Sequence, residues 1–335
     1  MSGDALSTLL SLCAADALGA ATEFKSPEAV KARYSLPLDR YEPGSVFGFA
    51  PGEATDDSQM TVATLLGYAR GDLQEVWVAL REWLAPGPPD VGNLTRAALR
   101  YPGPSGGVLA WEASGFQSAG NGGLMRVAAA WIAGLRGEAL ARESALLTAL
   151  THADPRCVHA SVALTALMEG LSLGMPLKDA GEAALKVMEQ TDAEDLLLSA
   201  GLFGALTLRA QATFRERDRE ARAQVRARVR AGLNGHLTSQ SGFVLDTLEA
   251  AIHHAGAQPA EGMNPWLASV GPATELGDDS DTVACVVGAL IGARGLTVPQ
   301  HLLPPLRLGH SWPGWDRSWT CLKHLPPVVA AAQRI

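Results

Sequence analysis

The stretch DDSDTVACVVGALIGA, residues 278 to 293, opens with three carboxylates and two hydroxyls and continues as an apolar run rich in Ala and Gly. Carboxylates are favoured in the first turn of a helix, where free N–H groups and the helix dipole attract negative charge. The stretch therefore predicts an apolar helix over 283–293 with an acidic cluster at its start. Ala284, Gly288 and Gly292 recur at every fourth position, so they share one face on which a second helix can pack closely.

A second cluster of the same form lies far away in the sequence. Thr55-Asp56-Asp57-Ser58 precedes the apolar helical stretch Gln59–Ala69. Either cluster alone is typical of a solvated acidic helix cap. Two such helix starts facing each other would form an all-oxygen pocket in which like charges repel and raise each other's pKa. Hard cations take carboxylate, hydroxyl and water ligands, so the repetition indicates a site for two divalent cations, Mg²⁺ or Mn²⁺.

Helical spacing of apolar residues runs through most of the chain, whereas strand alternation is nearly absent. Pro and Gly gather between the periodic segments, at 86–89, 102–107 and 304–305. We therefore expect an all-α fold, with one compact domain over residues 1–335. The segments predicted as helices are Leu6–Leu18, Asp56–Ala69, Met125–Leu135, Ala139–His152, Val158–Leu173, Ala193–Ala210 and Phe243–Ala255.

Composition excludes several classes of protein. The chain has 335 residues and 47% hydrophobic residues, which is enough for a large core. A net charge of −8 argues against general nucleic-acid binding. No leading signal segment and no apolar run long enough to span a bilayer are present, so we expect no membrane association. Four widely spaced cysteines without a CxxC pair predict reduced thiols in a cytoplasmic protein.

Three further motifs make the pattern specific: ADALGAATEF at 15–24, SAGNGGLMR at 118–126 and THADP at 151–155. Together with the two acidic clusters, their order and spacing resemble the ADP-ribosylglycohydrolase family. The stretch 241–251 resembles the penultimate core helix of that family, and the resemblance runs from about Leu10 to Leu296. Ala15 and Asp278 stand where the family usually has Gly. Neither departure removes a family ligand, and Asp278 either acts through its acidic neighbours or points to water.

The resemblance implies a compact orthogonal multi-helix domain and a hydrolase that cleaves the glycosidic bond between ADP-ribose and an acceptor. The expected partner is ADP-ribose or an ADP-ribosylated substrate, and the acceptor is a protein side chain or a small molecule. The resemblance implies Glu23 as the catalytic acid/base. It implies metal ligands at Thr55, Asp56, Asp57, Asp279, Asp281 and Thr282. It implies substrate-binding residues at Ser118, Gly120, Asn121, Gly122 and His152.

The residues themselves support these roles to different degrees. Glu23 follows an apolar helix in a weakly polar setting that would raise its pKa, although it could also end a helix at the surface. The glycines after Asn121 would let backbone N–H groups approach an anion. His152 could bind substrate or merely face a helix dipole. The resemblance implies a carboxylate near the Ser118 position in some arginine-directed members of the family, so its absence here argues against strict arginine specificity. Arg126 is either a buried structural charge or a phosphate clamp.

Alternative functions remain at this stage. Gly103-Pro104-Ser105-Gly106-Gly107 matches the G-x-S-x-G pattern of a serine hydrolase with Ser105 as nucleophile, but no strand pattern precedes it. A non-catalytic ADP-ribose-binding protein would be expected to lack metal ligands or Glu23, and this chain has them. Seven arginines between Arg215 and Arg230 favour a solvated helix face over a phosphate site. Trp312, Trp315 and Trp319 favour packing of the C-terminal segment over an adenine platform.

Overall fold

The computed structural model describes residues 4–333, and within this range it contains 16 α-helices and almost no strand. The all-α prediction is confirmed. The first eight helices are α1 Ala5–Gly19, α2 Pro27–Arg33, α3 Asp56–Arg70, α4 Leu73–Leu84, α5 Asn93–Leu99, α6 Gly106–Ala113, α7 Ala128–Ile132 and α8 Gly137–Ala149. The others are α9 Pro155–Ser172, α10 Leu177–Gln190, α11 Ala193–Ser199, α12 Leu208–Leu233, α13 Val244–Ala255, α14 Pro265–Glu275, α15 Ser280–Ala293 and α16 Cys321–Ala332.

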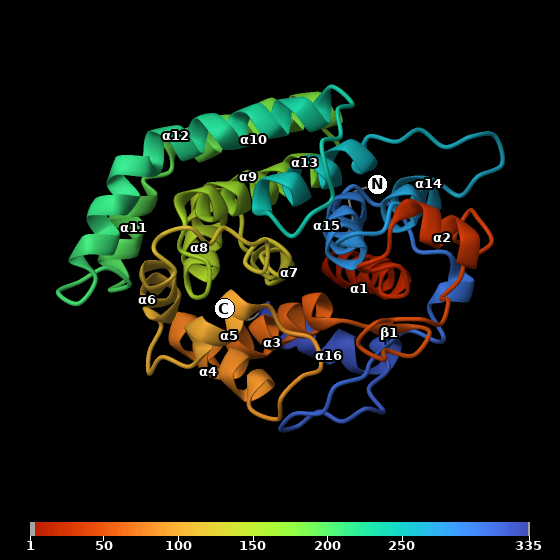
Figure 1. Ribbon diagram of the computed structural model, residues 1–335, viewed down its shortest axis with the longest axis horizontal. Coiled ribbons are helices and arrows are strands. Elements are labelled where there is room, and N and C mark those ends of the chain that lie inside the picture. Colours follow the sequence, from red (N-terminus) through yellow and green to blue (C-terminus); the bar gives the residue numbers. More distant parts are fainter. Residues whose placement is uncertain (1–3, 334–335) are drawn as a thin grey trace.

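The remaining regular elements are a 3-10 turn at Gln300–Leu302 and two short strands, β1 Glu53–Ala54 and β2 Arg307–Leu308, which pair in parallel. In Figure 1, α1 and α15 lie side by side although they come from opposite ends of the chain. Helices α9, α10, α12 and α13 pack together on one side, and α3, α4 and α16 on the other. Within residues 4–333, the helices fall short of the length and apolar character that crossing a bilayer requires.

The central pair α1 and α15 packs backbone against backbone because glycines line the contact. A Cβ added at Gly288 would lie 2.6 Å from the Ser11 carbonyl oxygen, and one added at Gly292 would lie 2.9 Å from the Thr8 Cα. The Ser11 hydroxyl donates to the Gly288 carbonyl at 2.6 Å and accepts a hydrogen bond from the Trp266 indole at 2.8 Å. The small residues predicted to allow close packing therefore face α1, and the acidic start of α15 is fixed beside it.

Two helix predictions are wrong in extent. The segment 193–210 is interrupted between α11 and α12, because Gly201 takes a left-handed backbone (φ +73°) just after the helix end. The segment 125–135 is helical only over α7. Its first residues form tight turns, with Val127 N–H bonded to the Leu124 carbonyl, and Gly134 (φ +98°) ends the helix. Local apolar spacing does not reveal such breaks, since the flanking residues remain apolar.

The arginine-rich helix α12 has a solvated face with ion pairs, as the sequence favoured. Only the Arg222–Asp218 pair has i,i+4 spacing. The other arginine pairs join α12 to neighbouring helices and are Arg209–Glu112, Arg215–Glu194, Arg226–Glu189, Arg228–Asp246, Arg228–Glu249 and Arg230–Glu182. Near the C-terminus, Trp312 and Trp315 are buried in the main core, and the Trp315 ring stacks on Trp319 at 4.4 Å. Packing, rather than a free aromatic platform, accounts for these tryptophans.

Replacing Gly288 with Val should destabilise the protein by about 1–3 kcal/mol or more, because the new side chain meets the α1 backbone inside a packed core. Thermal or urea unfolding measures the change. Gly204→Val is the matched control, since a Cβ at Gly204 meets no atom within 4 Å, and its effect should stay within about 0.5 kcal/mol. Equal stability of the two variants would contradict the close α1–α15 packing.

Candidate active site

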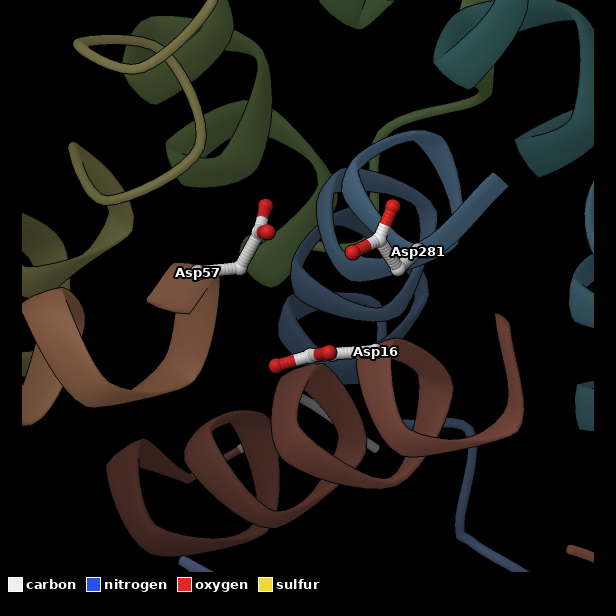
Figure 2. Close-up of side chains that lie close together, drawn as sticks. All are labelled: Asp16, Asp57 and Asp281. Carbon is white, nitrogen blue, oxygen red and sulfur yellow. The ribbon is translucent and has the colours of Figure 1, made fainter. Parts of the chain in front are cut away.

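Three helices bring carboxylates together at the centre of the molecule. Figure 2 shows Asp16 of α1, Asp57 of α3 and Asp281 of α15 pointing toward one another. One carboxylate oxygen from each of these residues lies within 4.8 Å of the others, and all three residues are buried. A second group of the same kind joins Glu23, Asp90 and Asp281. Asp281 belongs to both groups, so the two clusters are adjacent.

Asp16 connects α1 to the start of α3 through several hydrogen bonds. Its carboxylate accepts from the Thr55 N–H at 3.0 Å and the Thr55 hydroxyl at 2.8 Å. It also accepts from the Ser58 N–H at 3.1 Å and from the Ser58 hydroxyl. The pKa of Asp16 is raised to about 6, because burial outweighs the opposing effect of these hydrogen bonds. Asp16 thus accepts from two of the N–H groups at the start of α3 and places its carboxyl group beside Asp57.

The cluster contains more carboxyl groups than the described protein pairs with cationic side chains. Seven carboxylates make no ion pair within residues 4–333: Asp16, Glu23, Asp56, Asp57, Asp90, Asp279 and Asp281. Burial, followed by repulsion from Asp281 and other acids, raises the pKa of Glu23 to about 11. Burial also raises the pKa of Asp57 and of Asp281 well above the usual range, with neighbouring carboxylates adding to the effect.

Three buried oxygens point to what the cluster would accept. Within the described residues, Glu23 Oε2, Asp57 Oδ1 and Asp281 Oδ1 have no hydrogen-bond partner. A buried carboxylate oxygen without a donor is costly unless a cation approaches it. Carboxylates with nearby hydroxyls are the ligand set of hard divalent cations, so the residues present fit Mg²⁺ or Mn²⁺.

A cavity of about 260 Å³ opens beside the carboxylates. Its lining includes Glu23, Phe24, Asp56, Asp90, Thr95, Gly120, Asn121, Gly122, His152, Asp278, Asp279 and Asp281. The lining thus combines acidic side chains with the neutral polar groups of the loop 120–122 and His152. This combination suits a ligand that both binds cations and accepts hydrogen bonds.

Most of the residues predicted from sequence come together here. Thr55, Asp57 and Thr282 are not part of the cavity lining. The Thr282 hydroxyl donates to Asp57 Oδ2 at 3.3 Å, and the oxygen of the Thr55 hydroxyl, whose proton is directed to Asp16, lies 3.1 Å from the same atom. The Asn121 amide donates to Asp279 at 2.5 Å and to the Thr247 hydroxyl at 2.9 Å. Asn121 therefore holds the acidic loop of α15 against the start of α13.

Ser118 is not among the residues that line this cavity, and its N–H bonds the Ser114 hydroxyl at 3.3 Å. Two acids at the site were not singled out from the sequence. Asp16 lies inside a quoted motif, but nothing local distinguishes it from a helix-surface acid. Asp90 follows two prolines in the loop between α4 and α5, and only the tertiary fold brings it near Glu23.

Asp278 and Phe24 line the cavity, and backbone hydrogen bonds join Asp278 to the segment Phe24–Lys25. The Phe24 N–H donates to the Asp278 carbonyl at 2.7 Å, and the Asp278 N–H donates to the Lys25 carbonyl at 2.9 Å. Both residues have left-handed backbones, with φ of +54° for Phe24 and +56° for Asp278. The Asp278 side chain is exposed. Of the two readings from sequence, pointing to water fits it, while its backbone fixes the segment that carries Glu23.

With this geometry described, comparison with known proteins identifies the family. The model of the ADP-ribosylglycohydrolase family matches residues 3–325. The chain belongs to this family. It is 28% identical over 304 residues to an ADP-ribosylarginine hydrolase of Pseudomonas putida (strain GB-1), covering 85% of this chain and 68% of that protein. A solved structure described as an ADP-ribosylglycohydrolase-related protein complex shares the fold, with a TM-score of 0.67 and 22% identity over 98% of this chain and 96% of that one.

Membership in this family makes the chain a glycosidic-bond hydrolase. The serine-hydrolase alternative finds no support. Ser105 directly precedes α6, and its hydroxyl donates to the Gly201 carbonyl at 3.3 Å. Within residues 4–333 the strands are only β1 and β2, neither of which leads into Ser105. A nucleophile elbow requires a strand before the serine.

Asp278→Gly should stabilise the protein by up to about 1 kcal/mol, because glycine adopts the left-handed backbone without the steric cost of a Cβ. Thermal unfolding in a chelator measures the gain. Asp278→Ala removes the same carboxylate but keeps a Cβ, so it should lack this benefit. If Ala stabilises as much as Gly, charge repulsion rather than backbone strain is the cause.

The effect of replacing Asp281 on thermal stability should have opposite signs with and without divalent cations. In a chelator near neutral pH, Asp281→Asn should unfold at a higher temperature than the parent, because burial and the neighbouring acids raise the pKa of Asp281, so folding must protonate this carboxyl at a cost that the neutral amide avoids. With Mg²⁺ or Mn²⁺ at about 100 times Kd, the parent should gain about 2.7 kcal/mol and the variant much less. Asp278→Asn changes an exposed neighbouring acid and should keep the full gain. Equal metal stabilisation of Asp281→Asn and the parent would contradict the ligand assignment.

Proposed function

We propose that this chain is a divalent-metal-dependent hydrolase that cleaves the glycosidic bond between the ribose of ADP-ribose and an acceptor, releasing ADP-ribose. The observation that carries the proposal is the group of seven carboxylates without ion pairs, three of which have a buried oxygen lacking any donor, beside a cavity lined by Asn121 and His152. A structural acidic cluster would be expected to recruit Lys or Arg within the fold.

The side chains proposed to hold two cations are Asp16, Thr55, Asp56, Asp57, Asp279, Asp281 and Thr282. When bound, Mg²⁺ or Mn²⁺ would neutralise the cluster and orient the ribose hydroxyls and a water molecule. Asp16 adds to the set inferred from sequence, because it shares one group of close oxygens with Asp57 and Asp281. Asn121 positions Asp279 by its short hydrogen bond.

Glu23 is the proposed proton-transfer residue. Cleavage at the anomeric carbon passes through a cation-like sugar transition state and needs a proton moved between water and the leaving group. Glu23 lines the cavity, and its Oε2 has no partner within the described chain, so it is free to face a reacting atom. Its raised pKa leaves it protonated near neutral pH, and cations beside Asp281 would bring that pKa down toward the working range.

The substrate-binding part of the proposal uses the loop 120–122 and His152. Gly120 and Gly122 leave room for a ligand to approach the backbone, and Asn121 anchors the loop. The name of the Pseudomonas relative makes an ADP-ribosylarginine substrate the first to test. An ADP-ribosylserine peptide is the comparison, because the lack of a carboxylate at Ser118 argues against strict arginine specificity. The cytoplasmic location expected from the sequence stays a prediction, and all four cysteines are free and buried.

Glu23→Gln should lower turnover by roughly 10²–10⁴-fold, because the amide keeps the shape of the side chain but cannot exchange a proton. ADP-ribose affinity, measured by calorimetry with Mg²⁺, should change little. Glu28→Gln on the exposed face of α2 is the control and should behave as the parent. If the parent protein binds ADP-ribose but hydrolyses neither the arginine-linked nor the serine-linked substrate, the chain would instead be the non-catalytic ADP-ribose-binding protein on the same fold.

A further inference from the structure

Arg126 is fully buried beneath the substrate loop, and it is not a residue of the cavity lining. Its guanidinium donates to the Gly122 carbonyl, to the Leu147 carbonyl at 2.9 Å and to the Thr151 hydroxyl at 2.7 Å. Within residues 4–333 it has no carboxylate partner. The sequence left open whether Arg126 clamps a phosphate, and its burial rules out direct contact with a ligand in the cavity.

The contacts of Thr151 determine the direction of its hydrogen bonds. Arginine only donates, so the Thr151 oxygen must accept from Arg126. The hydroxyl proton then needs an acceptor, and the remaining contact of this hydroxyl in the described chain is His152 Nδ1 at 2.8 Å. Thr151 therefore donates to Nδ1. A neutral imidazole that accepts at Nδ1 carries its proton on Nε2.

The other edge of the His152 ring faces the cavity. A Cβ added at Gly122 would lie 2.8 Å from His152 Cε1 and 3.2 Å from Nε2, so the loop lies directly against this edge. No hydrogen-bond partner for Nε2 occurs among residues 4–333. Burial and the nearby charge of Arg126 lower the pKa of His152 to about 3, so the ring stays neutral.

We propose that Arg126 and Thr151 are positioning residues that fix His152 with its proton on Nε2, so that the ring donates a hydrogen bond to an oxygen of the bound substrate. The proposal rests on the proposed function, since the oxygen belongs to ADP-ribose. Arg126 acts twice in this arrangement: it orients Thr151, and through the Gly122 carbonyl it holds the loop that packs against the ring. A neutral donor also binds an oxygen without adding a charge that would compete with the cations.

The tautomer can be measured without any ligand. Nitrogen-15 NMR of the imidazoles at neutral pH should show His152 protonated on Nε2, with its signals identified among the eight histidines by their absence in His152→Gln. Thr151→Ser keeps the hydroxyl and should retain this pattern. Thr151→Val removes the donor to Nδ1 and should shift both nitrogen signals toward the average of the two tautomers. A parent ring protonated on Nδ1, or on both nitrogens, would overturn the proposal.

Binding of ADP-ribose in the presence of Mg²⁺ gives the second readout. Thr151→Val should bind roughly tenfold more weakly, whereas Thr151→Ser should bind within about twofold of the parent, because only the valine variant leaves Nδ1 without its donor. Valine-variant binding equal to the parent's overturns the proposal. A parent that binds no ADP-ribose overturns the proposed function and the substrate contact with it, while the tautomer measurement still decides the Arg126–Thr151–His152 arrangement.

Discussion

Repulsion among buried carboxylates is the constraint on which the rest of this structure depends. Asp57 and Asp281 come from helices at opposite ends of the chain, yet their oxygens approach within 4.8 Å of each other and of Asp16. Like charges at this distance in the interior raise one another's pKa and oppose folding. The fold must therefore hold α1, α3 and α15 together by other means, and a bound cation would convert the repulsion into attraction.

Those other means are close packing and hydrogen bonds to the acids. The absence of side chains at Gly288 and Gly292 brings the α15 backbone against α1, and the Ser11 hydroxyl connects the two helices. The Asp16 carboxylate accepts hydrogen bonds from the Thr55 and Ser58 N–H groups at the start of α3 and so joins α1 to that helix. The acids are thus arranged by contacts that do not themselves depend on a cation, which gives a site formed before ligand binding.

A separate polar network supports the neutral part of the cavity. Arg126 lies beneath it, and its pKa is lowered to about 9 by burial, which still leaves it charged near neutral pH. Burial, with the positive charge of Arg126 adding to it, keeps His152 uncharged, so the cavity lining combines strongly acidic groups with a neutral imidazole.

The sequence by itself determined the helical class, the two acidic helix starts and the glycine face of α15, because each depends on residues close together in the chain. It also gave the order of motifs by which the family is recognised. Only the tertiary structure decided that Asp16 and Asp90 join the acids, that Ser118 lies outside the cavity lining and that Arg126 is buried. The spacing of isolated residues carries no information about which helices meet. The break between α11 and α12 depends on the backbone angle of Gly201. The direction of the Thr151 hydrogen bond depends on Arg126, which is distant in sequence.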